Sequence, residues 1–168
     1  MSRELFWGEQ SAAALADVVR TALQRAQAKP EVHFLRTAFE NLVRFHERQL
    51  VTGELDEAQL AQFRADVDAA LRPLVDLVRD WAIDVKNDAQ SGREEDRFDT
   101  CRNRSAMAFL LADHADVPEL DEIREDVELV DDELHRMCES YGPISDEHQP
   151  RGLPADHWWW RCTGDHGG

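Results

Sequence analysis

The sequence predicts an all-α fold, a bundle of about five helices, from two observations. Through the first 140 residues the apolar side chains recur at three- and four-residue spacing, and no segment alternates in polarity like a half-buried strand. Glycine and proline are scarce there and fall where helices would begin or end. With 168 residues and 42% hydrophobic positions, the chain can bury one core. We therefore predict a single helical domain over residues 1–141 and an irregular arm over 142–168.

The first two predicted helices cover about residues 9–28 and 31–50. Small side chains form a narrow apolar stripe on the first, which would let a neighbouring helix approach closely. The second has a broad aromatic stripe, which indicates a central position. Pro30 suits the first turn of this second helix, and Gly53 follows its end.

A long third helix is predicted to begin at Asp56, with apolar positions that recur from Leu60 to Val85. Asp56 and Gln59 have the spacing of a capping box at its start. The apolar positions continue in phase through Pro73, which predicts a kink rather than an end. The alternative is two helices that meet near Arg72.

The fourth helix is predicted over about residues 92–114, opened by a second capping box at Ser91 and Glu94. The fifth begins near Pro118 and ends before Gly142. Its apolar residues follow strict three- and four-residue steps, typical of a narrow coiled-coil seam: Leu120, Ile123, Val127, Val130, Leu134, Met137 and Tyr141. Pairing of this seam with a second copy of the chain, as an oligomeric scaffold, is one functional hypothesis.

The arm carries three consecutive tryptophans, Trp158, Trp159 and Trp160, between His157 and Arg161. In an extended segment Trp158 and Trp160 would point one way and Trp159 the other. One interpretation is that the arm docks on the bundle and covers apolar surface. The other is a recognition segment, because tryptophan and arginine dominate binding hot spots.

The formal charge of −16 is unevenly distributed. Residues 1–50 hold 6 acids and 7 bases, whereas residues 113–139 hold 12 acids and 2 bases. A field of this sign disfavours direct binding of nucleic acid and of anionic membranes. The sequence also lacks an apolar run of 18 residues and the pattern of a signal peptide, so we expect a cytoplasmic protein.

Most of the excess charge falls on the predicted fifth helix, on positions that face away from the seam. We call these positions the acidic surface: Asp121, Glu122, Glu125, Glu128, Leu129, Asp132 and Glu139. Like charges at three- and four-residue spacing destabilise a helix, and a basic partner would relieve that repulsion. The alternative is a solvated face that only keeps the protein soluble.

Residues for metal or covalent chemistry are sparse. His33, His46 and His114 lie in or beside apolar stripes and could converge with Glu40 as a metal or small-ligand site. Asp132 precedes His135 by three residues, but His135 is expected to point to solvent. No nucleophile motif or phosphate-binding glycine loop is present, so we predict no cofactor and no catalytic residue.

The three cysteines, Cys101, Cys138 and Cys162, are an odd number without CxxC spacing. The pattern therefore predicts neither a disulfide framework nor a zinc site. Cys101 and Cys138 are expected to be small core residues.

The leading functional hypothesis is a small acidic binding protein of the inhibitor or immunity type. Its acidic surface would neutralise a basic protein partner such as a nuclease toxin, with Leu129 or the tryptophan arm as apolar anchor. The alternatives are a metal- or small-ligand-binding helical enzyme that uses His33, Glu40, His46 and His114, and the self-associating scaffold.

Overall fold

The computed structural model describes residues 10–163, and in this range it is all-α, as predicted. The ends of the two predicted segments, residues 1–9 and 164–168, lie outside the described residues. The described range contains no strand and six α-helices: α1 (Ala12–Ala28), α2 (Val32–Thr52), α3 (Glu57–Leu71), α4 (Val75–Gln90), α5 (Arg97–Asp113) and α6 (Arg124–Tyr141). None of these helices is both long and apolar enough to cross a membrane.

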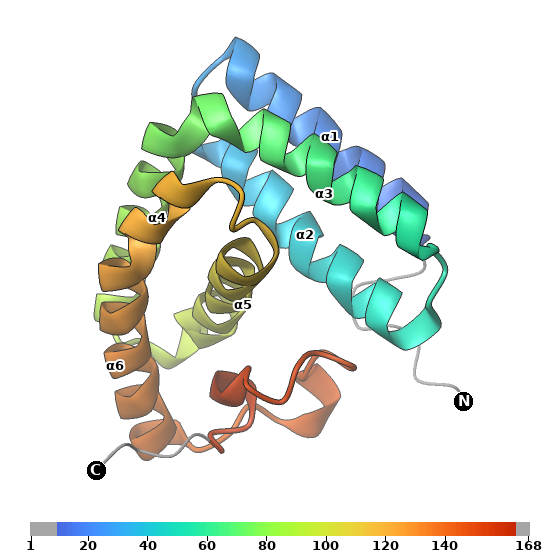
Figure 1. Cartoon of the computed structure of the whole chain (residues 1–168). Coiled ribbons are helices and arrows are strands. Elements are labelled where there is room, and N and C mark those ends of the chain that lie inside the picture. The colour runs from blue at the N-terminus through green and yellow to red at the C-terminus, as the bar shows by residue number, and fades with distance from the viewer. Residues whose placement is uncertain (1–9, 164–168) are drawn as a thin grey trace.

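The helices pack as two groups around a common core. α1 lies along α2 with α3 beside it, and α4 packs against α6 (Figure 1). α5 contacts α2, α4 and α6, so it occupies the middle of the bundle. The arm folds back beneath α5, and Leu153, Trp159 and Trp160 join the core. The arm is therefore part of the packed structure.

The predicted long third helix is two helices. A 3-10 turn, Arg72–Leu74, separates α3 from α4, and the two helices run in different directions (Figure 1). Pro73 has no backbone N–H and cannot continue the hydrogen-bond ladder. Leu74 leaves the helical region at φ −107° and ψ 8°. The single-helix prediction was wrong, and its alternative, a break near Arg72, is confirmed.

One predicted capping box forms and the other does not. The Asp56 side chain accepts from the Gln59 backbone N–H, and Gln59 Oε1 accepts from the Asp56 N–H. Ser91 caps nothing: its Oγ lies 3.4 Å from Asp96 Oδ2, and a 3-10 turn, Glu94–Asp96, precedes α5. Gly92 takes up a left-handed conformation at φ 64°, which turns the chain before the helix can begin.

The predicted fifth helix begins with a 3-10 segment, Pro118–Ile123, before α6. Six of its seven seam residues are buried inside the molecule, and Tyr141 at the end is 40% exposed. Because α6 packs against α4 and α5, the seam already has its partners within the chain. The seam therefore buries its apolar residues without a second copy of the chain.

The structure contains a disulfide between Cys138 at the end of α6 and Cys162 in the arm, 24 residues apart. The prediction of no disulfide was wrong, because only the return of the arm brings these two residues together. Cys101 is free and buried, as expected. The disulfide and the buried tryptophans together hold the arm to the bundle.

Candidate functional site

The acidic surface lies on the exposed side of α6 and of the 3-10 segment before it. Its first two carboxylates are paired: Asp121 lies 3.0 Å from Arg124, and Glu122 lies 3.0 Å from Arg79 on α4. Exposed ion pairs of this kind add little stability. They do neutralise the charge at the N-terminal end of the surface.

The middle of the acidic surface has no such compensation. Glu125, Glu128, Asp132 and Glu139 are exposed, and no basic side chain of the described residues lies within ion-pair distance of them. Leu129 lies among them and is 42% exposed. Three- and four-residue spacing places these side chains on one face of α6.

The acids nearer the bundle are different, because each has a basic partner. Asp126 lies 3.5 Å from Lys86, Glu133 pairs with Arg136, and Asp131 receives two hydrogen bonds from Arg104, at 2.6 and 3.2 Å. α6 therefore has a compensated side and an uncompensated side. The sequence predicted that the charge lies on this helix, but it could not show which acids have a basic partner and which do not.

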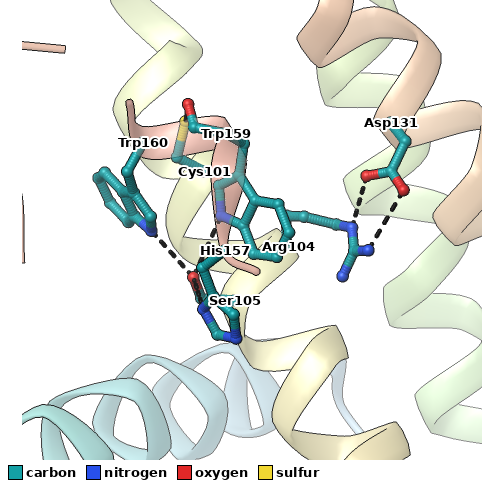
Figure 2. Close-up of polar contacts among 7 residues, drawn as sticks. All are labelled: Cys101, Arg104, Ser105, Asp131, His157, Trp159 and Trp160. Carbon is teal, nitrogen blue, oxygen red and sulfur yellow. Dashed lines mark hydrogen bonds and ion pairs between the residues drawn. The ribbon is translucent and has the colours of Figure 1, made fainter. Parts of the chain in front are cut away.

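The three tryptophans form a 3-10 turn, Trp158–Trp160, rather than an extended segment. The predicted alternation of their side chains was therefore wrong. Trp159 and Trp160 are buried, at 1% and 2% exposed, and both indole N–H groups donate to Ser105 Oγ, at 3.2 and 3.0 Å (Figure 2). This burial favours the docking interpretation of the arm.

Ser105 also fixes the tautomer of His157. A hydroxyl oxygen accepts two hydrogen bonds, and both places are taken by Trp159 and Trp160. The Ser105 O–H must then donate to His157 Nδ1, 3.0 Å away, which puts the ring proton on Nε2. Burial lowers the pKa of His157 to about 4, against an opposing effect of Asp156.

Arg104 links the arm to α6. Its guanidinium carbon lies 4.3 Å from the centroid of the Trp159 ring, while its nitrogens bind Asp131 (Figure 2). His135 was predicted to point to solvent. Instead its ring stacks on that of Trp158, with the centroids 4.0 Å apart. Of the predicted recognition residues in the arm, Trp158 is half-buried and Arg161 is exposed.

The predicted metal or ligand group does not assemble as a set. His33 is exposed and pairs with Glu31 at 3.0 Å, and Glu40 binds Arg102 at 3.1 Å. Across residues 10–163, no three His, Cys, Asp or Glu side chains are arranged to hold a metal ion.

His46 and His114 do share a pocket, and His157 of the arm joins them. The pocket has a volume of about 330 Å³ and lies between α2, α3, α5 and the arm. The His114 Nδ1 lies 2.6 Å from an oxygen of Asp68, and His46 stacks on Phe109 with centroids 3.9 Å apart. Burial, with smaller effects of His114, Arg64 and His157, lowers the pKa of His46 to about 3. The sequence could not bring His157 here, because the path of the arm sets its position.

Comparison with family models, with curated proteins and with solved structures finds no match to this chain.

Proposed function

We propose that this protein binds a basic protein partner through its acidic surface, as an inhibitor or immunity-type protein. The observation that supports this is the uncompensated group on α6, in which Glu125, Glu128 and Asp132 flank the exposed Leu129. The other acids of the same helix form ion pairs with neighbouring bases. A high content of acids therefore does not by itself explain why this group has no ion pairs among the described residues. A partner with a cationic, nucleic-acid-binding site, such as a nuclease toxin, has the complementary chemistry.

Two energetic effects favour binding of a basic partner here. Carboxylates three or four residues apart repel one another by a few tenths of a kcal/mol per pair, and cations from a partner would remove that cost. Long-range attraction raises the association rate, while tight binding needs desolvated contacts at the centre. Leu129 supplies an apolar contact surrounded by charge.

Charge reversal tests the proposal. The variant Glu125→Lys/Glu128→Lys/Asp132→Lys is compared with Asp17→Lys/Asp80→Lys/Asp88→Lys, which makes the same change of charge on α1 and α4. The probes are purified basic nucleases, measured by surface binding at about 50 mM and about 300 mM salt. We expect the α6 variant to bind roughly tenfold or more weakly than the wild type, and the control to lose much less. Equal losses in both variants, or none, would contradict the proposal.

The proposed compartment is the cytoplasm, where thiols are kept reduced. Cys138 and Cys162 would then be free thiols, and the buried Trp159 and Trp160 would hold the arm. Acid quenching of cells followed by alkylation of free thiols tests this. Modification of both cysteines is expected, and a protected pair would place the protein in an oxidising compartment.

A second candidate function is binding of a small ligand in the histidine pocket. The supporting observation is the pocket itself, in which His46, His114 and His157 face aromatic and apolar side chains. Pockets of this size with a few polar groups are typical ligand sites. Phenol and indole serve as probes, followed through the histidine ring signals in NMR spectra. We expect these signals to shift in the wild type. The shifts should disappear in Ala108→Phe, which fills the pocket, and persist in Ala61→Phe, at an exposed position of α3. This pattern would support ligand binding in the pocket.

A further inference from the structure

The buried guanidinium of Arg97 lies against the Cys138–Cys162 disulfide. Arg97 Nη2 is 3.2 Å from Cys162 Sγ and 3.8 Å from Cys138 Sγ. Arg97 is only 5% exposed, and its Nε has no hydrogen-bond partner. Arginine stays protonated at all ordinary pH values, so a full positive charge is buried here.

This charge has no counter-ion in the described part of the chain. Glu94, Tyr141 and His148 line an adjacent pocket with Arg97, but none of them forms an ion pair with it. Arg97 is the first residue of α5, where the helix dipole disfavours a cation, whereas the nearby C-terminal end of α6 favours one. These two effects oppose each other. The guanidinium of Arg97 therefore lies against two neutral sulfur atoms.

A buried charge without a counter-ion is strongly unfavourable. Reduction of the disulfide would supply the missing counter-ion, because a thiolate at Cys162 would lie at hydrogen-bond distance from Arg97. A cation beside a cysteine favours the thiolate, and stabilising the reduced form makes a disulfide a stronger oxidant. We propose that Cys138 and Cys162 are an exchange-active pair: the disulfide oxidises dithiols, Arg97 stabilises the thiolate produced, and in a reducing compartment such as the cytoplasm the pair rests as thiols.

The exchange proceeds in two displacements. One thiolate of the dithiol attacks Sγ of Cys162, a partly exposed residue, and the electron pair of the S–S bond leaves with Cys138 Sγ. The Cys138 thiolate then takes a proton from solvent. The second thiol of the dithiol, after losing its proton, attacks the mixed disulfide and releases Cys162 as a thiolate beside Arg97. Two electrons pass to the protein, and the dithiol becomes a cyclic disulfide.

The test is the equilibrium of the full chain with mixtures of reduced and oxidised dithiothreitol, read by mass spectrometry after acid quenching and alkylation. The variant Arg97→Met should shift the equilibrium at least tenfold toward the disulfide, which corresponds to about 30 mV for a two-electron couple. The control is Arg93→Met, which removes a nearby but exposed arginine. We expect this control to stay within about twofold of the wild type. An unchanged equilibrium in a folded Arg97→Met variant would overturn the proposal.

A second measurement uses the wild type alone and decides the question if Arg97→Met does not fold. Reduced protein is alkylated with iodoacetamide across a range of pH, and the modified peptides are identified. Cys162 should react at about pH 6 at half or more of its rate at about pH 9, as a thiolate does. Burial raises the pKa of Cys101 to about 12, so this third thiol should stay unmodified and serve as an internal control. A Cys162 reaction that begins only above about pH 8 would contradict a role for Arg97.

Discussion

Ser105 is the residue at which three buried side chains of the arm meet the bundle. Its single hydroxyl group serves Trp159, Trp160 and His157, and all four residues are buried. Leaving a buried donor without its acceptor lowers the free energy of unfolding by about 1–3 kcal/mol. Because three hydrogen bonds meet at the Ser105 hydroxyl, loss of this one group should have a large effect on stability. Nothing in the sequence indicates this role, because a serine among apolar residues of a helix has no distinctive pattern.

The substitution Ser105→Ala should lower the free energy of unfolding by roughly 3 kcal/mol, since two indole N–H groups and one imidazole lose their partner. Urea denaturation followed by tryptophan fluorescence measures it. Ser145→Ala is the matched control, because Ser145 Oγ bonds only the exposed His148. Similar small losses in both variants would show that the Ser105 contacts contribute little.

His157 should make stability depend on pH. Its folded pKa of about 4 lies below the unfolded value of 6.5, so the unfolded chain binds more protons between these values. The free energy of unfolding should therefore fall as the pH drops through this window. His157 alone should contribute a loss of roughly 2 kcal/mol by about pH 5.

The variant His157→Asn, which retains an acceptor near the position of Nδ1, tests this by urea denaturation at about pH 7 and about pH 5. We expect a smaller loss in the variant than in the wild type. His46 has an even lower folded pKa and should leave a residual dependence in both proteins. Identical pH dependence in wild type and variant would mean that His157 is not buried as a neutral ring.

At the level of helices, the sequence predicted more than at the level of single contacts. The apolar periodicity covered the α-helices of the described residues, although it joined α3 and α4 into one, because burial of one face decides helix position in a bundle. It failed where local chemistry competed with periodicity. The apolar stripe continues in phase across the exposed Pro73, yet the chain leaves the α-helix there, and Gly92 turns the chain where Ser91 was expected to cap.

The Asp56 capping box offers a test of an element end. Asp56→Ala should lower the free energy of unfolding by about 1 kcal/mol, because the first turn of α3 loses its acceptor. Thermal and urea unfolding measure it. Asp76→Ala, at a fully exposed side chain on α4, should change stability much less. A neutral Asp56→Ala variant would mean that packing alone fixes the start of α3.

At the level of the molecule, the predicted division into bundle and arm describes the chain, but the arm is more firmly attached than a tail. Its attachment combines burial of Trp159 and Trp160 with the Cys138–Cys162 link. The sequence could not reveal either contact. Both join residues far apart in the chain, and a three-cysteine count with irregular spacing has no unique pairing.

The variant Cys138→Ser/Cys162→Ser should lose roughly 3 kcal/mol of unfolding free energy, as expected for opening a loop of this length. The arm should nevertheless stay docked, because the tryptophans remain buried. Limited proteolysis across residues 143–157 and near-ultraviolet circular dichroism check this. Rapid cleavage there with loss of the tryptophan signal would show that the disulfide, and not aromatic packing, holds the arm.

The decisive experiment for the proposed function is mapping of a bound basic protein on the wild-type chain by backbone amide NMR. Once a basic nuclease has been found to bind, the amide signals of residues 121–139 should shift or broaden on its addition, most strongly around Leu129. Signals of α1 should stay unchanged. Shifts confined to the histidine pocket or the arm, or spread evenly over the molecule, would contradict binding through the acidic surface.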